Sequence, residues 1–426
     1  MHSVAPMADT FCFGLMQATN GSRMNPEMGP KGALHSRCHR SGQADATASE
    51  TGIRPWCFLY LAVVGSFVFR LTLFDFESHD YLLFLSRWYE FYVEHGRWQG
   101  LGLQEPGATY PPLYLYLISL STLLPLPKLY AIKMLSVSVD YLGAWYVWRL
   151  ARRHSPSTLH AWIAVSAFLF LPTVVMNGSL WGQCDVMYLT CLLASLFYLL
   201  ENRPMGALMA FGLSCALKPQ AIFWCPLLAG LFISGRLPWK RIWMPAAVVF
   251  ACGIPALLAG RLFTKLLGAV TRAGTEPLLT LGATNWYQWV SMDRSRLMWT
   301  SGVLLTLLFT TWFVFWVRKM SRRLLTSRCF VSLALLSVLF PPFLLPGMHE
   351  RYFFAADVMS IVYAVYRRGG WRIAALVQFA SALTYLPFLF DVEPVPRSIL
   401  ALVMFTVVAW VLKDLIRSPQ PSLQLG

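Results

Sequence analysis

The polar residues that could do chemistry in this chain lie in five short segments between long apolar stretches. These segments are Glu77-Ser-His-Asp80, Asn177-Gly-Ser-Leu-Trp-Gly-Gln-Cys-Asp185, Lys218-Pro-Gln220, Asn285-Trp-Tyr-Gln288 and His349-Glu-Arg351, the last followed by Asp357. Carboxylates can accept protons or bind hydroxyl groups, whereas Lys, Arg and protonated His bind phosphate and other anions. The residue types therefore indicate acid–base or anion-binding chemistry, provided that the fold brings the segments together.

A group of cations is the clearest of these signals. His349 and Arg351 come at the expected start of a helix, where backbone N–H groups are free, so they form a suitable anion site. The alternative for this pair is an interfacial anchor. Lys218 lies at the apex of a tight hairpin between two short predicted helices. There it either extends to the membrane surface or meets a phosphate as the third cation of the site.

Three further ionisable residues have open roles. Asp185 begins a predicted helix, where it could bind a sugar hydroxyl, cap the helix or carry charge in a reaction. Lys133 and Asp140 lie on one face of a predicted span, roughly 10 Å apart along the axis at about 1.5 Å per residue. That is too far for a direct ion pair unless both side chains bend. Ionisable groups in a bilayer are usually functional or paired, so these two either belong to a structural network or line a site.

The composition shows what must position these residues. Of the 426 residues, 57% are hydrophobic and 13% are charged, against about 25% charged in soluble domains. The chain is therefore a polytopic membrane protein. Its net charge of +15 does not indicate a nucleic-acid partner, because many of the Lys and Arg residues lie in short loops, where they set topology. Nine Cys residues without a CxxC pair indicate neither a disulfide framework nor a zinc site.

The apolar stretches predict an all-α transmembrane bundle of about twelve spans. We expect spans near 53–74, 129–149, 159–177, 184–200, 205–219, 221–233, 243–262, 298–317, 329–346, 352–366, 372–390 and 397–414. Residues 111–124 are apolar but short for a crossing, which is typical of a re-entrant or buried segment. Together these stretches predict one membrane domain over residues 51–418. We expect residues 1–50 to be a disordered cytoplasmic tail and residues 419–426 to be a short cytoplasmic one.

The basic loops predict the orientation of this bundle. Lys and Arg gather in 149–153, 236–241, 318–328, 367–372 and 413–417, which alternate with loops poorer in these residues. Cytoplasmic loops of membrane proteins carry such an excess. All five polar segments then face outward, and the first outward loop covers 75–111. Their clustering predicts one site at the outer membrane face, built from many spans.

The first outward loop begins with an amphipathic pattern. At helical spacing, one stripe holds Asp80, Arg87, Glu90 and Glu94, and another holds Tyr81, Leu85, Trp88 and Tyr92. A helix this rich in Trp and Tyr is predicted to lie in the membrane interface. Asp80 begins the polar stripe only a few residues after the first span. The stripe is either the solvated face of this helix or the start of a site.

The ordered set of motifs resembles the GT-C superfamily of glycosyltransferases, which use polyprenyl-phosphate sugars at the outer or lumenal membrane face. The matching pieces are Asp80-Tyr81 with Trp88 and Glu90, Tyr110-Pro-Pro-Leu113, Lys133 with Asp140, Trp181-Gly-Gln-Cys-Asp185, Lys218-Pro-Gln220 and His349-Glu-Arg-Tyr352. The chain is similar to bacterial mannosyltransferases related to the second GPI mannosyltransferase. It is also similar to the dolichyl-phosphate-glucose glucosyltransferases. His79 replaces the Gly that precedes the loop Asp in the glucosyltransferases, and Trp181-Gly-Gln-Cys-Asp185 replaces their His-rich motif; both departures favour mannose.

The resemblance implies roles for individual residues. Asp80 would be the general base, His349 would lie by the donor phosphate, and Lys218 would be a second phosphate contact. The other expected substrate-binding residues are Tyr110, Lys133, Asp140, Gln183, Asp185, Gln220, Glu350 and Arg351. An inverting transfer needs one base for the acceptor hydroxyl and cations for the leaving phosphate. No metal and no other cofactor is expected, because Lys218, His349 and Arg351 can neutralise that phosphate.

The resulting prediction is a membrane hexosyltransferase, with mannose favoured, acting on a lipid-linked or cell-envelope glycan. Its expected partners are the bilayer, the polyprenyl-phosphate sugar and the glycan acceptor, with no nucleic acid. The expected location is a bacterial inner membrane with the site facing the periplasm. The alternative is a polytopic transporter or flippase of lipid-linked saccharides. Many transporters show internal repeats of spans, and this sequence shows none.

Overall fold

The structure is a computed structural model that describes residues 55–103, 110–264, 278–290, 296–322 and 326–417. The two predicted tails, residues 1–50 and 419–426, lie outside these ranges. So do residues 104–109 of the predicted first outward loop.

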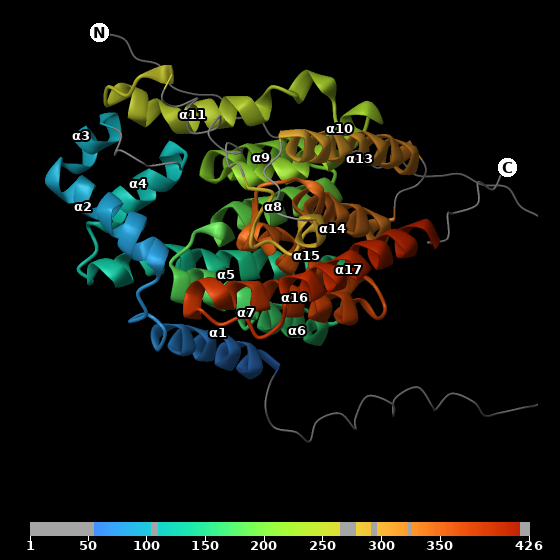
Figure 1. Cartoon of the computed structure of the whole chain (residues 1–426), viewed down its shortest axis with the longest axis horizontal. Coiled ribbons are helices and arrows are strands. Elements are labelled where there is room, and N and C mark those ends of the chain that lie inside the picture. The colour runs from blue at the N-terminus through green and yellow to red at the C-terminus, as the bar shows by residue number, and fades with distance from the viewer. Residues whose placement is uncertain (1–54, 104–109, 265–277, 291–295, 323–325, 418–426) are drawn as a thin grey trace, which may run out of the picture. The chain divides into compact units, whose positions relative to one another are not determined.

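Helices make up almost all of the regular structure in the described residues (Figure 1). The first part of the chain has α1 (Pro55–Leu71), the π-helix η1 (Tyr81–Leu85), α2 (Ser86–Glu94), α3 (Arg97–Gly102), α4 (Pro112–Ser121) and α5 (Lys128–His154). The middle has α6 (Thr158–Leu169), α7 (Pro172–Val175), the π-helix η2 (Met176–Trp181), α8 (Asp185–Leu200), α9 (Pro204–Leu217), η3 (Pro219–Trp224), α10 (Cys225–Ile233), η4 (Trp239–Arg241) and α11 (Met244–Leu258). The last part has β1 (Thr280–Leu281), η5 (Trp286–Trp289), α13 (Arg296–Arg322), α14 (Ser327–Leu344), β2 (Met348–His349), η6 (Glu350–Phe353), α15 (Phe354–Tyr366), α16 (Gly370–Phe390) and α17 (Arg397–Arg417).

The lengths of these helices confirm a multi-pass membrane protein. Five helices in the described ranges are long and apolar enough to cross a bilayer: Trp239–Leu258, Arg296–Ser321, Ser327–Leu344, Gly370–Phe390 and Arg397–Arg417. A sixth span results if Thr158–Leu169 and Pro172–Trp181, bent by 47°, act as one. Each predicted span has a helix at its place, but about twelve crossings are not confirmed. Several of these helices, such as α8 with 16 residues, are shorter than the roughly 20 residues that a crossing needs.

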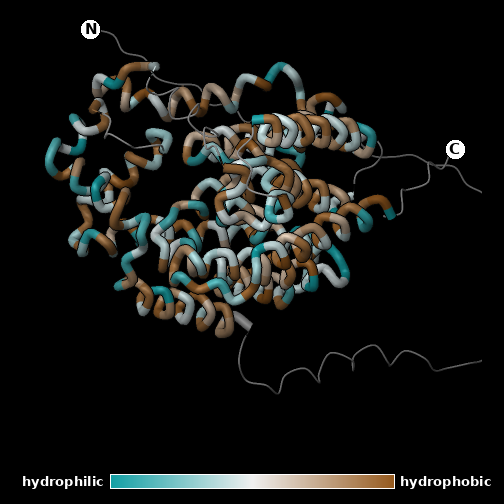
Figure 2. The backbone as a smooth tube through the Cα atoms, viewed as in Figure 1, coloured by the Kyte–Doolittle hydropathy of each residue, from teal (hydrophilic) through white to brown (hydrophobic). Residues whose placement is uncertain are grey.

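The faces of the outer helices fit a lipid environment. Phe58 and Leu61 on α1 are 59% and 62% exposed, and Leu308 on α13 is 69% exposed. Figure 2 shows many hydrophobic residues along α1 and α13. Such apolar exposure over whole helices is unusual for a soluble monomer. In this chain it marks surfaces that contact acyl chains.

The predicted amphipathic helix of the first outward loop is confirmed as η1 and α2. Tyr81, Leu85, Trp88 and Tyr92 are all buried, as their helical spacing predicts. Trp88 packs on Tyr110, with ring centroids 5.3 Å apart. The buried stripe thus fixes the start of this loop, including the position of Asp80.

Helices α3 and α4 pack against the C-terminal end of α11 (Figure 1). The Arg261 guanidinium donates a hydrogen bond of 2.9 Å to the Leu101 carbonyl, and the Tyr116 hydroxyl accepts one from the Ala256 amide. Gly102 allows the close approach, since a Cβ there would lie 1.8 Å from the Ala259 carbonyl oxygen. These contacts join the first outward loop to the middle of the chain.

The basic segments meet at the other end of the bundle. Arg153 forms an ion pair with Glu201 at 2.8 Å, and Arg367 forms one with Asp414 at 3.3 Å. Arg236 donates a hydrogen bond to the Ser321 carbonyl. This end therefore collects the C-terminal ends of α5, α8, α10, α13, α15 and α17. The positive-inside pattern predicts that these segments share one side.

Candidate active site

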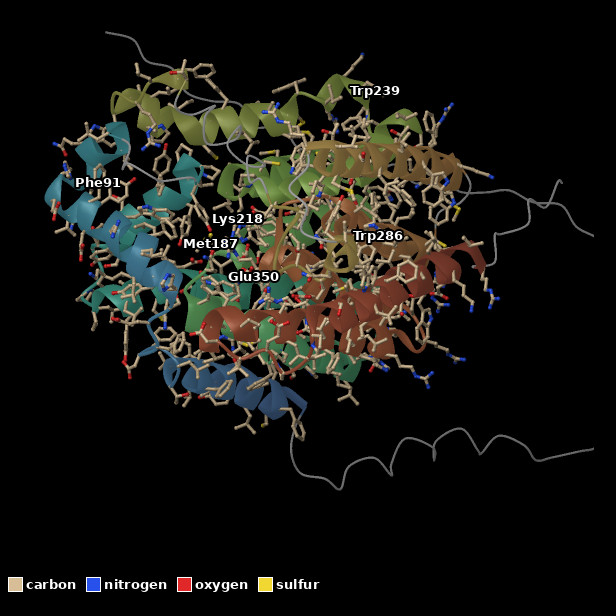
Figure 3. The ribbon with its side chains drawn as sticks, in the orientation of Figure 1. Phe91, Met187, Lys218, Trp239, Trp286 and Glu350 are labelled. Atoms are coloured by element: carbon tan, nitrogen blue, oxygen red, sulfur yellow. The ribbon has the colours of Figure 1, made fainter. Side chains whose placement is uncertain are left out.

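The polar segments predicted to form one site do converge, at the end of the bundle where α8 begins. Asp80 leads into η1, Trp181 ends η2, and Asp185 starts α8. Lys218 lies between α9 and η3, and Glu350 starts η6. Figure 3 shows Lys218 and Glu350 in the interior, with Met187 of α8 between them in this view. These segments are far apart in the sequence, but each lies at or next to the end of a helix, and these helix ends lie at the same end of the bundle.

Asp80 is held through one of its two carboxylate oxygens. Its Oδ2 accepts a hydrogen bond of 2.8 Å from the Trp181 indole N–H and another from the Gln183 side-chain amide. The Arg351 Nη1 lies 3.8 Å from the same oxygen. Among the described residues, none donates a hydrogen bond to Oδ1. The side chain of Asp80 is 13% exposed, so its second oxygen remains available to a substrate.

The geometry around Asp80 depends on a short stretch with an unusual backbone. Trp181 is fully buried and stacks on Phe388 at a centroid distance of 4.4 Å. Gly182 follows at φ +78°, which only glycine adopts without strain. This turn aims Trp181 and Gln183 at the same carboxylate. The Ser78 hydroxyl donates to the Trp181 carbonyl at 2.7 Å, which ties the two loops together.

Gln183 links Asp80 to a second ionic group. Its side-chain oxygen accepts a hydrogen bond of 2.9 Å from the Tyr110 hydroxyl and one of 3.5 Å from the Lys218 ammonium. The Ser136 hydroxyl donates to the Gln183 carbonyl at 2.6 Å. The side-chain nitrogen of Gln183 donates to Asp80, and its side-chain oxygen accepts from Tyr110 and Lys218. These contacts fix the orientation of the amide. Four of the predicted site residues therefore form one chain of contacts.

Lys218 and Asp185 form a closed ion pair. Their Nζ and Oδ1 atoms are 2.5 Å apart, with side chains 3% and 1% exposed. The second Asp185 oxygen accepts a hydrogen bond of 2.8 Å from the Asn177 amide, and the Lys218 ammonium lies 5.3 Å from the Tyr110 ring centroid. The buried Lys218 ammonium thus has its counter-charge in direct contact.

The His349-Glu350-Arg351 segment is positioned by a two-strand pairing. β2 pairs in parallel with β1, and Leu281 lies opposite His349. The Glu350 carboxylate lies 3.1 Å from Arg351 and 3.8 Å from the His349 imidazole. Burial alone would raise the pKa of the Glu350 carboxyl, but His349 and Arg351 lower it below its usual range. Glu350 therefore orients its two basic neighbours as an anion.

Arg351 connects this segment to Asp80. Its guanidinium lies over the Trp181 ring at 5.2 Å and near Asp80 Oδ2 at 3.8 Å. Its Nε is buried and has no hydrogen-bond partner among the described residues. Buried donors usually find partners. An unused donor next to the candidate base marks a place for a substrate oxygen.

Two other predicted site residues have structural partners. The Lys133 ammonium donates to the carbonyls of Leu73, Phe74 and Phe76, the last at 2.6 Å. Asp140 forms a fully buried ion pair with Arg70 at 3.1 Å. These contacts favour the structural network over the site wall. A role of either residue in binding substrate stays a prediction.

Gln220 and Asn285 are less tightly tied to the centre. The Gln220 Oε1 is buried and accepts no hydrogen bond from the described residues. Asn285 precedes η5, and both polar atoms of its fully buried side chain are likewise without partners within those ranges. The predicted binding role of Gln220 is not tested by these contacts.

The sequence analysis predicts that Asp80, Asp140 and Asp185 belong to the site, but it assigns no role to the side chains that hold these carboxylates. Trp181 begins the motif Trp181-Gly-Gln-Cys-Asp185, and its indole donates directly to Asp80. Asn177 holds Asp185, and Arg70 neutralises Asp140. An Arg inside an apolar span is itself a signal for a buried partner. That signal was present at Arg70.

The described residues contain no group of three or more His, Cys, Asp or Glu side chains placed to hold a metal ion. The charged groups of the centre are instead the cations Lys218 and Arg351 with the carboxylates of Asp80, Asp185 and Glu350. That arrangement can bind an anion beside a carboxylate with one open oxygen. The prediction that the reaction needs no metal stays a prediction.

Comparison with known families gives one match. The model of glycosyltransferase family 87 matches residues 108–342, more than half of the chain. That range includes Tyr110, Gln183, Asp185 and Lys218, whereas Asp80 lies before it. No curated protein matches the chain.

Proposed function

This chain belongs to glycosyltransferase family 87, and from that premise we propose that it transfers mannose to a glycan at the outer membrane face. Membership establishes a membrane glycosyltransferase of the GT-C type that uses polyprenyl-phosphate sugars as donors. The proposal adds the sugar, the acceptor and the mechanism. The acceptor is a lipid-linked or cell-envelope glycan, and the transfer inverts the configuration at the anomeric carbon.

Asp80 is the general base of the proposed reaction. The supporting observation is its asymmetry: Oδ2 is held by Trp181 and Gln183, whereas Oδ1 accepts no hydrogen bond from the described residues. The acceptor hydroxyl oxygen attacks the anomeric carbon, its proton moves to Asp80 Oδ1, and the bond from that carbon to the phosphate oxygen breaks. A base positioned in this way contributes about 10²–10⁴ in rate.

The leaving phosphate needs positive charge nearby. The candidate site has such charge close to the held oxygen of Asp80, where Arg351 Nη1 lies 3.8 Å from Oδ2. Arg351 offers its unpartnered Nε. Lys218 already donates to Asp185 and lies 3.5 Å from Gln183, and an ammonium has three N–H groups, so one donor remains for a phosphate oxygen. His349, with its side chain 32% exposed, would approach the phosphate from the open side. Cations that face developing negative charge in a buried site are a large source of catalysis.

The choice of mannose, the outward orientation and a bacterial inner membrane rest on the sequence. Trp181-Gly-Gln-Cys-Asp185 and His79 favour the mannosyltransferase-like branch, as set out above. The basic ends of the helices lie together opposite the site, which fits a cytoplasmic basic face and a periplasmic site.

The test uses the full chain reconstituted in lipid vesicles with radiolabelled polyprenyl-phosphate mannose, polyprenyl-phosphate glucose or a nucleotide-linked mannose. A total lipid and glycan extract serves as acceptor. We expect label to enter a glycan only from the polyprenyl-phosphate mannose. Transfer of glucose in preference to mannose would contradict the sugar. Movement of a lipid-linked saccharide across the vesicle without a new glycosidic bond would favour the flippase alternative.

A further inference from the structure

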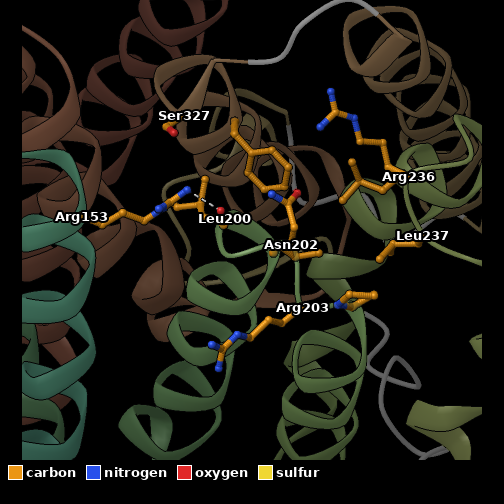
Figure 4. A pocket seen from close by; sticks show the side chains of 11 residues that line it. Arg153, Leu200, Asn202, Arg203, Arg236, Leu237 and Ser327 are labelled. Atoms are coloured by element: carbon orange, nitrogen blue, oxygen red, sulfur yellow. Dashed lines mark hydrogen bonds between the residues drawn. The ribbon is translucent and has the colours of Figure 1, made fainter. Parts of the chain in front are cut away.

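A second polar pocket lies at the end of the bundle opposite the candidate active site (Figure 4). α8 starts at Asp185 in the site and ends at Leu200 in this pocket, and its 16 residues separate the two by about 24 Å. The pocket has a volume of about 260 Å³, several times the roughly 30 Å³ that one water occupies in the liquid. Its lining comes from the ends of α5, α8 and α10 and the starts of α9 and α14. Its charged and polar side chains are Arg153, Asn202, Arg203, Arg236 and Ser327.

The charge of this basic pocket is strongly positive. Three arginines line it, and one of them, Arg153, is paired with Glu201 at 2.8 Å. Among the described residues, neither Arg203 nor Arg236 forms an ion pair; Arg236 donates only to the Ser321 carbonyl at 3.2 Å. Figure 4 shows Arg153 and Arg236 on two sides of the pocket, with the Arg203 side chain below them in this view. Two unneutralised arginines remain for an anion.

Helix ends add to this positive charge. α9 begins at Pro204 and α14 begins at Ser327, and both residues line the pocket. The first backbone N–H groups of a helix have no intrahelical partners, and the helix dipole places a partial positive charge there. Helix N-termini therefore favour phosphate and similar groups. At these two ends Pro204 has no N–H and the Cys329 amide already donates to the Thr326 hydroxyl, so they contribute mainly their dipoles.

The wall also has the polar side chains of Asn202 and Ser327, together with an apolar part. Leu199, Leu231, Leu237 and Phe330 make up that apolar part. A small inorganic anion gains nothing from these apolar side chains, whereas a phosphate that carries a glycerol and acyl chains does. The pocket also lies among helix ends on the basic side, where proteins meet the negatively charged lipid headgroups of the cytoplasmic leaflet.

We infer that this basic pocket binds the phosphate of an anionic glycerophospholipid from the cytoplasmic leaflet. Arg203 and Arg236 contact the phosphate oxygens, while Leu231 and Phe330 contact the glycerol and the first acyl carbons. The inference is independent of the sugar-transfer proposal, because none of these residues belongs to the candidate active site.

The test measures thermal unfolding of the purified full chain in detergent. Three soluble probes are titrated: dioctanoyl-phosphatidylglycerol, dioctanoyl-phosphatidylcholine and inorganic phosphate. A molecule that binds only the folded protein raises Tm with its concentration. We expect phosphatidylglycerol to raise Tm in a saturable way, with phosphatidylcholine and inorganic phosphate at least tenfold weaker.

Variants then assign the effect to the pocket. Arg203→Gln combined with Arg236→Gln should weaken the apparent affinity for phosphatidylglycerol at least tenfold. Arg203→Gln alone should weaken it severalfold and should leave folding intact, because this side chain is exposed on the surface. The matched control is Arg368→Gln with Arg372→Gln, two exposed arginines of the same basic side outside the pocket. The control should bind like the unaltered chain.

Three results would overturn the inference. Equal affinity for inorganic phosphate and phosphatidylglycerol would assign the pocket to a free anion. Equal weakening in the control would show general surface attraction. An unchanged response in both Arg203 variants would place the lipid elsewhere.

Discussion

Asp80 and Asp185 lie in one chain of contacts through Gln183, yet their surroundings differ in kind. Both oxygens of Asp185 are occupied, by Lys218 and Asn177, and its side chain is 1% exposed. Asp80 has only one oxygen held and keeps some exposure. A carboxylate with all its hydrogen-bonding capacity used builds the frame of a site. One with an unused oxygen can take a proton.

The difference also explains why a list of acidic residues is a poor guide to catalysis. Asp140 also has one oxygen, Oδ1, without a hydrogen-bond partner among the described residues, but its side chain is fully buried with Arg70. Of these three carboxylates, only Asp80 combines donors on one oxygen with an open side. The predictions below test that contrast in order of the expected effect.

The largest effect is expected for Asp80→Asn, which keeps the size of the side chain but cannot accept the proton. Turnover should fall by about 10²–10⁴, with a much smaller change in donor binding. The measurement is single-turnover transfer from polyprenyl-phosphate mannose, with donor affinity determined separately. Near-normal turnover in Asp80→Asn together with complete loss in Asp185→Asn would reverse the roles of the two carboxylates.

Asp185→Asn should act mainly on folding. It leaves the Lys218 ammonium buried without its counter-charge, and breaking a buried ion pair typically costs about 3–5 kcal/mol. Thermal unfolding in detergent measures the loss. Lys218→Met combined with Asp185→Asn removes both charges and should recover much of the stability. If the single variant unfolds like the unaltered chain, the pair is not the frame that its burial indicates.

Arg351→Gln should weaken donor use rather than folding. The loss of a charge-assisted contact to the phosphate costs about 1.5–3 kcal/mol, or roughly 10- to 150-fold in donor affinity. The measurement is the donor dependence of transfer. Arg372→Gln is the control, since Arg372 is exposed on the basic side of the bundle, opposite the site. Equal donor dependence in both variants would remove Arg351 from the phosphate site.

The smallest effect is expected for Lys128→Ala, which breaks the pair with Glu90 on the polar stripe of α2. Both side chains are well exposed, and such pairs contribute about 0.2–1 kcal/mol. The hydrogen bond from Lys128 lowers the pKa of the Glu90 carboxyl, so this contribution is present at neutral pH and is lost as the pH falls through the lowered pKa. Thermal unfolding at pH 7 and pH 4 measures it. A loss as large as that of Asp185→Asn would mean that the stripe is more than a solvated face.

Features that depend on helical periodicity could be predicted from the sequence. Each apolar run predicted as a span contains a helix, although the short α3 was not predicted, and the spacing of Tyr81, Leu85, Trp88 and Tyr92 predicted the buried face of η1 and α2. The positive-inside pattern predicted which helix ends lie together. All of these depend on repeats within a few turns of one helix.

Contacts between segments that are far apart in the sequence could not be predicted in this way. Asp80 and its donor Trp181 are 101 residues apart, and Arg70 and Asp140 are 70 apart. Lys133 and Asp140 share a helical face, but each has its partner on the segment around α1 rather than on the other. Helical spacing says which side chains share a face and cannot say which other helix that face meets.

The contacts of α5 with the beginning of the chain have a consequence for how this protein is made. Arg70 in the last turn of α1 pairs with Asp140 of α5, and Lys133 of α5 donates hydrogen bonds to the carbonyls of residues that follow α1. Both contacts need α5, which the ribosome synthesises scores of residues after α1. Until α5 is inserted, Arg70 therefore lacks its Asp140 partner, and the residues after α1 lack their hydrogen bonds to Lys133. The loop that carries Asp80 can be fixed only after that event, so the order of helix insertion, and not only the final packing, sets when this loop forms.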